Sequence, residues 1–209
     1  MSQSLGKQNI TRVRVFVDFW NYTLAMKSVE TDFKTDWAKI GASIAKEAAQ
    51  LIDPIGGCSY QGTNVYLSFD SSKEADKKLR NWATNTLDKF AGVYVSLAER
   101  QRKKGWPRCP KCHAEVQTCA ICGADMRGTE EKGVDTRIVT DMLSLAWADN
   151  YDVAVIVSAD RDFVPAAEFL QTKGLKVVHG AFPPMGTMLM QKCWGSIDLP
   201  KLRSSFARA

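Results

Sequence analysis

Long hydrophobic runs are missing from this chain of 209 residues. No apolar stretch approaches the roughly 18 residues that a membrane-spanning helix needs, and the start of the chain, MSQSLGKQN, lacks the apolar core of a signal peptide. A Gly-rich phosphate-binding loop is also missing, which argues against a nucleotide cofactor. We find no internal repeat. These absences predict a cytoplasmic protein that contacts no membrane.

The composition is that of an ordinary soluble protein, with 45% hydrophobic and 24% charged residues. It predicts one domain with at most a small appendage. The net charge of +5 is modest, but the basic residues are unevenly distributed. One segment holds six of them and the aromatic Trp106 with no acid between: Arg100, Arg102, Lys103, Lys104, Arg108 and Lys111.

Five short apolar segments alternate with segments of helical periodicity. They cover residues 13–19, 64–69, 93–97, 153–157 and 175–179. The fourth reads VAVIV, and its lack of polar alternation is typical of a strand buried on both faces of a parallel sheet. The alternation predicts an α/β fold with a mainly parallel, five-stranded, doubly wound sheet and right-handed crossovers.

The alternation is interrupted between residues 100 and 129, where neither helical nor strand periodicity is long enough to assign. We therefore expect a main domain formed by residues 12–99 and 130–200, with residues 100–129 as an insertion. Residues 1–11 and 201–209 are expected to be flexible tails.

Aspartates follow two of the predicted strands. Asp18 ends the first strand, while Asp160 and Asp162 follow the fourth. If the strand order reverses between these two strands, their carboxyl ends are adjacent, and ligands bind such a point in doubly wound sheets. Asp135 opens the helix before the fourth strand and lies on that helix's apolar side, so it is expected to point toward the sheet.

Carboxylates gathered so closely repel one another unless a cation neutralises them. Mg²⁺ or Mn²⁺ prefers such oxygen ligands, and phosphodiester hydrolysis is the reaction that such a site performs readily. The predicted metal ligands are Asp18, Asp135 and Asp160; Asp162 and Asn21 complete the catalytic set, with Ser158 and Asp141 as accessory residues. Asp141 ranks below Asp135 because six residues place it ~9 Å farther along the helix. The alternative interpretation makes Asp135 and Asp162 helix caps.

Four of the six cysteines are spaced C-x2-C-x6-C-x2-C, namely Cys109, Cys112, Cys119 and Cys122. Two such pairs suit one tetrahedral, structural Zn²⁺. His113 is an alternative fourth ligand. Zinc would order the loop, and the basic residues beside it could then bind phosphates while Trp106 stacks on a base. The alternative is a solvated charged loop.

Three short motifs occur in a fixed order: FVDFWN at residues 16–21, KGVD at 132–135 with Asp141 six residues on, and SADRDFVP at 158–165. This combination resembles the NYN-domain (LabA-like) branch of the PIN-like nuclease superfamily, and the resemblance covers most of residues 12–180. It implies a three-layer α/β/α sandwich and a metal-dependent ribonuclease. The family's acids match Asp18, Asp135 and Asp160, and its accessory positions match Asn21, Asp141 and Asp162.

The chain departs from the family pattern at two positions beside these acids. Ala159 stands where glycine is frequent, and Trp20 stands where a small residue is common, so Trp20 is expected to narrow the site or to stack on a base. We predict an endoribonuclease whose partner is RNA. The alternatives are a non-catalytic RNA-binding or partner-binding module, and a Toprim-like nuclease or a phosphatase. In a Toprim domain the first strand should end in glutamate, whereas this one ends in Asp18.

Overall fold

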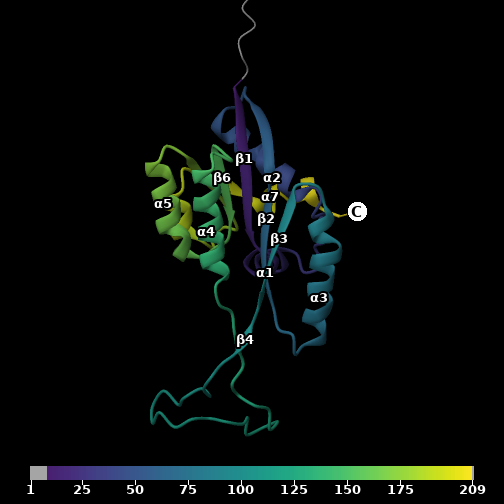
Figure 1. Ribbon diagram of the computed structural model, residues 1–209, viewed down its shortest axis with the longest axis vertical. Coiled ribbons are helices and arrows are strands. Elements are labelled where there is room, and N and C mark those ends of the chain that lie inside the picture. Colours follow the sequence, from purple (N-terminus) through teal and green to yellow (C-terminus); the bar gives the residue numbers. More distant parts are fainter. Residues whose placement is uncertain (1–8, 209) are drawn as a thin grey trace, which may run out of the picture.

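The computed structural model describes residues 9–208 and contains a six-stranded sheet in which all neighbouring strands are parallel (Figure 1). The strand order is β3-β2-β1-β6-β7-β8. The strands are β1 (Ile10–Asp18), β2 (Gly57–Phe69), β3 (Val93–Glu99), β6 (Val153–Val157), β7 (Lys176–Ala181) and β8 (Gly195–Asp198). The predicted α/β class is confirmed, but the prediction of five strands is wrong. The sixth strand, β8, is short and polar at alternate positions, so it contains no apolar run that would mark it.

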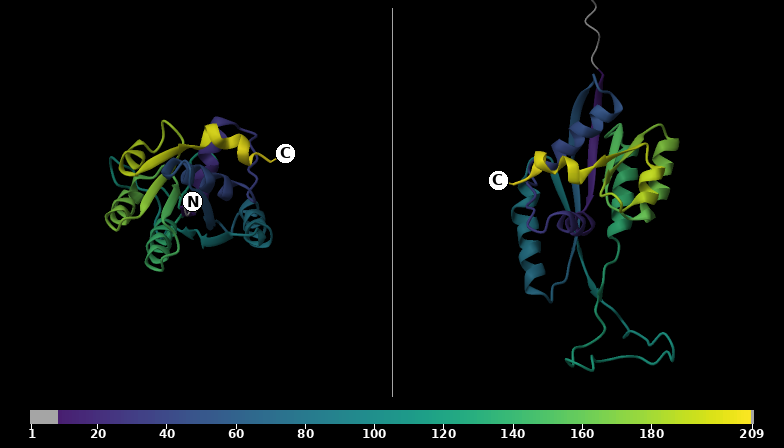
Figure 2. Two further views of the ribbon diagram at one scale, coloured as in Figure 1. Left: turned by 90° about the horizontal axis from the view of Figure 1, so that it is seen from above. Right: turned by 180° about the vertical axis from the view of Figure 1, so that it is seen from behind.

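Helices cover both faces of the sheet (Figure 2). Val15 and Val17 of β1 belong to one hydrophobic cluster, which includes Tyr22 and Ile44, whereas Phe16 belongs to a second cluster with Ile138. The first cluster holds buried residues of α1 (Phe19–Val29), α2 (Ile40–Ile52), α3 (Glu74–Asn85) and α7 (Leu199–Leu202); the second holds those of α4 (Val134–Trp147), α5 (Val164–Thr172) and α6 (Thr187–Lys192). The alternation of β1 side chains thus gives the predicted α/β/α sandwich.

Three single-turn 3₁₀ helices complete the main body: η1 (Leu87–Lys89), η2 (Arg161–Phe163) and η3 (Arg203–Phe206). Phe206 is fully buried and β1 begins at Ile10, so the two ends are ordered farther than the tails predicted for residues 1–11 and 201–209. The remainder of those predicted tails, residues 1–8 and 209, lies outside the described residues. Among residues 9–208, no helix has the length and apolar character needed to cross a bilayer.

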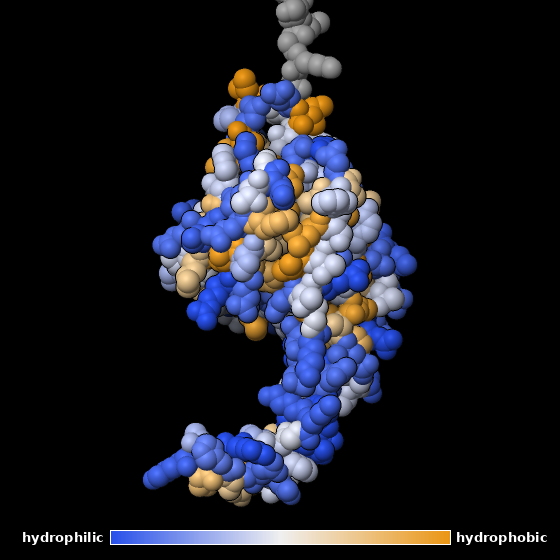
Figure 3. Space-filling model, turned by 60° about the vertical axis from the view of Figure 1, so that its left-hand side comes forward, coloured by the Kyte–Doolittle hydropathy of each residue, from blue (hydrophilic) through white to orange (hydrophobic). Residues whose placement is uncertain are grey.

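The insertion, residues 100–129, leaves the body through β4 (Gln101–Arg102) and returns through β5 (Thr129–Glu130), which pair in antiparallel fashion. It projects from the body as an open loop (Figure 1). Its surface is mostly hydrophilic (Figure 3). None of residues 100–129 is buried, so the insertion has no hydrophobic core of its own, which explains why no periodicity is visible in its sequence.

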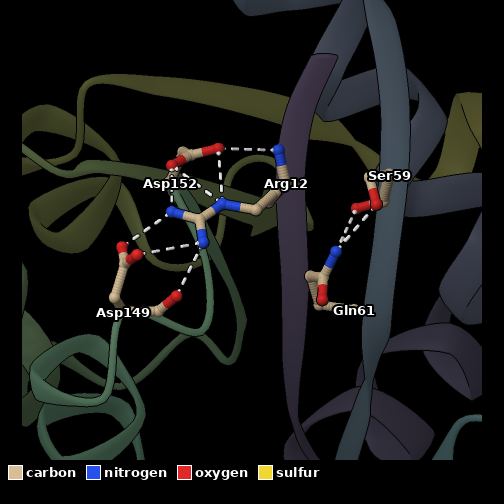
Figure 4. Close-up of polar contacts among 5 residues, drawn as sticks. All are labelled: Arg12, Ser59, Gln61, Asp149 and Asp152. Atoms are coloured by element: carbon tan, nitrogen blue, oxygen red, sulfur yellow. Dashed lines mark hydrogen bonds and ion pairs between the residues drawn. The ribbon is translucent and has the colours of Figure 1, made fainter.

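The amino end of β1 is attached to the segment before β6 by Arg12 (Figure 4). Its guanidinium donates to both carboxylate oxygens of Asp152 and to Asp149, with shortest distances of 2.7 Å. The backbone N–H of Arg12 donates to Asp152 as well, at 2.9 Å. The hydrogen bond from Arg12 is the main cause that lowers the pKa of Asp152.

We expect Arg12→Met to lower the free energy of unfolding by about 1 kcal/mol, a modest value because the pair is partly solvated. The thermal midpoint should fall by about 2–4 °C. Since the folded pKa of Asp152 is lowered, this contribution is present above its unfolded pKa and is lost as the pH falls through the folded value. Thermal melts at pH 7 and pH 3 measure this, with Lys77→Met, which removes an exposed pair with Glu74, as the control. Equal decreases of the thermal midpoint in Arg12→Met and Lys77→Met at pH 7 would contradict the stabilising role of the contact between Arg12 and Asp152.

Candidate active site

The carboxyl ends of β1 and β6 are adjacent, because Val17 pairs with Val157 in parallel register. The chain runs from β1 to β3 on one side of this point and from β6 to β8 on the other. The predicted reversal of strand order is therefore confirmed. Asp18 and the segment from Ser158 to Asp160 consequently lie side by side at one edge of the sheet.

Asp18 is held by hydrogen bonds from two elements. It is the N-cap of α1, where one carboxylate oxygen accepts from the backbone N–H of Asn21 at 3.1 Å, and the other oxygen accepts from the hydroxyl of Ser158 at 3.3 Å. Its exposed fraction is 9%. Burial raises the pKa of Asp18, and the bonds from Asn21 and Ser158 oppose that rise.

The loop after β6 is fixed by contacts with its neighbours. The side-chain oxygen of Asn21 accepts from the backbone N–H of Ala159 at 2.9 Å. The carbonyl of Ser158 accepts from Nε2 of the fully buried His179 on β7, at 2.7 Å. Both bonds restrict the direction in which the loop presents Asp160.

Asp160, and not Asp162, is the cap in this loop. Its carboxylate accepts from the backbone N–H of Asp162 at 2.9 Å and caps η2, while α5 starts without a side-chain cap. The alternative interpretation of Asp162 as a helix cap is therefore wrong. Asp162 lies on η2 with its residue exposed.

Asp135 lies in the first turn of α4 and is not its cap, since Gly133 occupies that position in a left-handed conformation. Loss of water around its carboxyl group, followed by repulsion from nearby carboxylates, raises the pKa of Asp135 to about 6. The carboxylates responsible are, in order, Asp18, Asp160, Glu131 and Asp162. We call these five residues the acidic cluster.

Glu131 is the member of the acidic cluster that sequence reasoning missed. It stands at the end of the insertion, four residues before Asp135, and repulsion from it also contributes to the raised pKa of Asp18. Its carboxylate accepts a hydrogen bond from the hydroxyl of Ser68, at the end of β2. The only signal in the sequence is an acid directly before the KGVD motif.

Asp141 is separate from the acidic cluster. Its carboxylate accepts from the hydroxyl of Tyr66 on β2 and from Nε of Arg137, each at 3.0 Å. It is not among the carboxylates that raise the pKa of Asp135. In the structure Asp141 thus attaches α4 to the sheet, and its predicted accessory role finds no support.

The chemistry of the acidic cluster suits a hard divalent cation. Its donors are carboxylate oxygens, and their mutual repulsion, visible in the raised pKa of Asp135, is what such a cation relieves. The set is not closed into a complete coordination shell, because nowhere in residues 9–208 do three His, Cys, Asp or Glu side chains converge enough to hold a metal ion. The three predicted ligands, Asp18, Asp135 and Asp160, are all members of the acidic cluster.

The two cysteine pairs form two equivalent turns. In each turn the first cysteine exchanges backbone hydrogen bonds with the residues after the second cysteine, at 2.8–2.9 Å, and a left-handed residue, His113 or Gly123, follows. Backbone N–H groups donate to the sulfur of Cys109 and of Cys119 and lower the pKa of both thiols. The turns share the pattern C-x-x-C-x-A-acid, so the insertion contains a short repeat that we did not expect.

The four cysteines do not meet in the structure. Within the described chain, no three of Cys109, Cys112, Cys119 and Cys122 form a group that could hold a metal. All four are free thiols in the structure, as are Cys58 and Cys193. The predicted single zinc site is therefore not assembled, although each turn resembles half of one.

The basic residues of the insertion are only partly available. Three form ion pairs within the protein: Arg100 with Glu131 at 3.7 Å, Arg102 with Asp125 at 2.6 Å and Arg108 with Glu115 at 3.2 Å. The ring of Trp106 is covered by the guanidinium of Arg127, 4.7 Å from its centroid. The exposed lysines of this segment that form no such pair with any of residues 9–208 are Lys103, Lys104 and Lys111.

Comparison with known proteins identifies a family and a shared fold. The NYN domain family matches residues 12–199. A crystal structure of a protein of unknown function, VPA0982 from Vibrio parahaemolyticus, has a TM-score of 0.54 and 16% identity over 99% of this chain and 100% of that one, which shows a shared fold. A solved structure described as a structural basis for the mechanism and regulation of Sir2 enzymes matches at a TM-score of 0.38 and 11% identity, over 93% of this chain and 90% of that one. This similarity is too low to indicate a shared fold. No functionally curated protein matches the chain.

Proposed function

Because the chain belongs to the NYN domain family, a family of PIN-like nucleases whose substrate is nucleic acid, we propose that it is a metal-dependent endoribonuclease that hydrolyses RNA phosphodiesters. The observation that carries this proposal is the gathering of carboxylates from three separate elements at the carboxyl ends of β1 and β6. Asp18, Asp135 and Asp160 would hold Mg²⁺ or Mn²⁺. A purely structural role would not explain why carboxylates that repel one another lie so close together.

Each side chain has a defined task in this proposal. A cation held by these aspartates would supply an activated water and would stabilise the leaving oxygen. Asn21 and Ser158 orient Asp18 and the loop that presents Asp160, through the hydrogen bonds described above. Asp162, exposed on η2, can accept a proton from the attacking water.

The insertion is the proposed grip for the substrate. Three of its lysines, Lys103, Lys104 and Lys111, are exposed and have no ion pair within the described part of the chain, so they can contact RNA phosphates without first breaking one. On the ring face that Arg127 covers, Trp106 could stack on a base only after Arg127 moves. We therefore assign the grip mainly to charge.

The test is an incubation of the purified protein with labelled RNA and with labelled DNA in Mn²⁺, with and without chelator. We expect internal cleavage of RNA that the chelator stops. If RNA remains intact and calorimetric titration of Mn²⁺ gives no heat of binding, the protein is instead a non-catalytic RNA-binding or partner-binding module. Cleavage that persists in chelator would contradict the role of the carboxylates.

We also propose that the four cysteines of the insertion bind one structural Zn²⁺. The support is that each turn directs backbone N–H groups at a sulfur and so favours the thiolate that zinc needs. Zinc binding would require the two turns to approach each other.

Purified protein should accordingly contain about one zinc per chain, and the double substitution Cys109→Ser with Cys112→Ser should remove it. Metal analysis by mass spectrometry measures the content. Cys58→Ser, which replaces an exposed thiol on β2, is the matched control and should keep its zinc. Zinc-free protein from a zinc-supplemented preparation would speak against the site.

A further inference from the structure

The two ends of the insertion meet beside the acidic cluster. Arg100 directly follows β3, Glu131 directly follows β5, and the two side chains form an ion pair at 3.7 Å. Ser68 contacts both, since its hydroxyl donates to Glu131 and accepts from Nε of Arg100 at 2.9 Å. The root of the insertion is thereby joined to the site.

Arg100 is oriented by Trp20, the second residue after Asp18. The guanidinium lies over the Trp20 ring at 5.3 Å from its centroid, and the indole N–H of Trp20 donates to the carbonyl of Ser68 at 2.7 Å. The expected stacking of Trp20 on a base is thus prevented on this side of the ring, because a protein side chain occupies it. The unusual Trp20 serves here as a platform for a cation.

The hydrogen-bonding capacity of Arg100 is largely unused. A guanidinium has five N–H donors, yet only Nε makes a hydrogen bond to a residue of the described chain. The contact to Glu131 is an ion pair longer than a hydrogen bond. The side chain of Arg100 is 27% exposed, so its remaining donors can reach a ligand.

Arg100 also lines a groove of about 690 Å³ at the root of the insertion. The other two cations of this groove have carboxylate partners in it: Lys73 pairs with Asp70 at 3.6 Å and Arg102 with Asp125 at 2.6 Å. The partner of Arg100, in contrast, is a member of the acidic cluster and is repelled by it. Arg100 is therefore the cation that connects the groove to the cluster.

We propose that Arg100 binds an RNA phosphate next to the acidic cluster and that Glu131 is a positioning residue which holds Arg100 until the phosphate replaces it. This rests on the proposed function. Phosphate matches the fork of a guanidinium and can accept two N–H bonds, whereas Glu131 accepts none from it at 3.7 Å. Trp20 and Ser68 keep the guanidinium in place during the exchange. The RNA strand would then run from the groove, across Arg100, into the site.

The test measures binding of labelled single-stranded RNA by fluorescence anisotropy in buffer without Mg²⁺ or Mn²⁺, where no cleavage occurs and the proposed zinc stays bound. We expect Arg100→Gln to weaken binding about tenfold. Arg100→Lys should weaken binding less than Arg100→Gln but should not reach the wild-type affinity, because an ammonium cannot bind bidentately. Lys46→Gln removes the same charge from an exposed position on α2, outside the insertion, and should weaken binding about twofold or less. Equal effects of Arg100→Gln and Lys46→Gln would overturn the proposal.

The variant Glu131→Gln tests whether Glu131 competes with RNA for Arg100 or is needed only for the structure of the site. Removing the competing carboxylate should tighten RNA binding, and by more than Glu130→Gln, which removes the same charge from a neighbour paired with Lys132. Weaker binding in Glu131→Gln would contradict the proposed exchange. Since these assays need no Mg²⁺ or Mn²⁺, they test the inference even if the protein cleaves no RNA. If it cuts RNA normally and Arg100→Gln changes neither affinity nor KM, this inference fails while the proposed function stands.

Discussion

Replacing Asp18 by asparagine is expected to abolish Mn²⁺-dependent RNA cleavage while leaving the fold at least as stable as before. The loss should exceed about 100-fold, because residues that only orient metal ligands are already worth 10–100-fold. Asparagine has the shape of aspartate and is itself a good N-cap, so its oxygen can still accept from the backbone N–H of Asn21. Its amide can donate to the hydroxyl oxygen of Ser158.

The stability of this variant follows from the burial of Asp18. Burial raises its pKa, so the ionised carboxylate disfavours the folded state near neutral pH, and wild-type stability rises as the pH falls through the folded pKa. The asparagine side chain that replaces it has no proton to bind, so the Asp18→Asn variant should lose this dependence on pH. Thermal melts at pH 5 and pH 8, beside cleavage assays, measure both effects.

A matched control for Asp18→Asn is available in Asp141→Asn. Asp141 is partly buried and hydrogen-bonded, but it lies outside the acidic cluster. Its substitution should lower stability modestly, because the amide oxygen can still accept from Tyr66 and Arg137 but carries no charge, and should leave cleavage nearly unchanged. If Asp141→Asn abolishes cleavage in a folded protein, our assignment of the site is wrong.

The adjacency of Asp18 and Asp160 could be predicted from the sequence because it depends on chain-wide regularities. Apolar runs mark buried parallel strands, and the carboxyl ends of such strands lie at one edge of the sheet. The choice of cap could not be predicted in the same way. Asp160 and Asp162 both precede the helix, and local backbone conformation decides that Asp160 bonds to the N–H of Asp162.

The contacts at the root of the insertion could not be predicted from the sequence, for a different reason. Glu131, Arg100 and Ser68 are far apart in the sequence and meet only in the fold. Ion pairs likewise changed the interpretation of the basic segment. Arg102 and Arg108 are paired with Asp125 and Glu115, which follow the basic run. A segment without acids in sequence is thus partly neutralised in space.

Asn21→Ala is expected to reduce cleavage and Mn²⁺ affinity about 10–100-fold, although Asn21 carries no charge. Its side chain holds Ala159 N–H at 2.9 Å and so positions the loop that presents Asp160. Burial raises the pKa of Asp18, and hydrogen bonds from Asn21, including one from its side chain, oppose that rise. The alanine variant keeps the hydrogen bond from the backbone N–H of residue 21 to Asp18 and loses the hydrogen bond from the side chain. The pKa of Asp18 should rise further, and the acid limb of the pH–rate profile should move to higher pH.

The measurement is a pH–rate profile together with calorimetric titration of Mn²⁺ for wild type, Asn21→Ala and Thr23→Ala. Thr23 lies two residues further along α1, and its side chain makes no hydrogen bond within the described residues, so its substitution controls for altered helix stability. A uniform loss of rate without a shift of the acid limb would show that Asn21 acts on the loop alone. An unchanged Mn²⁺ affinity would contradict its role in orienting Asp18 and Asp160, and with it the link between α1 and the loop after β6.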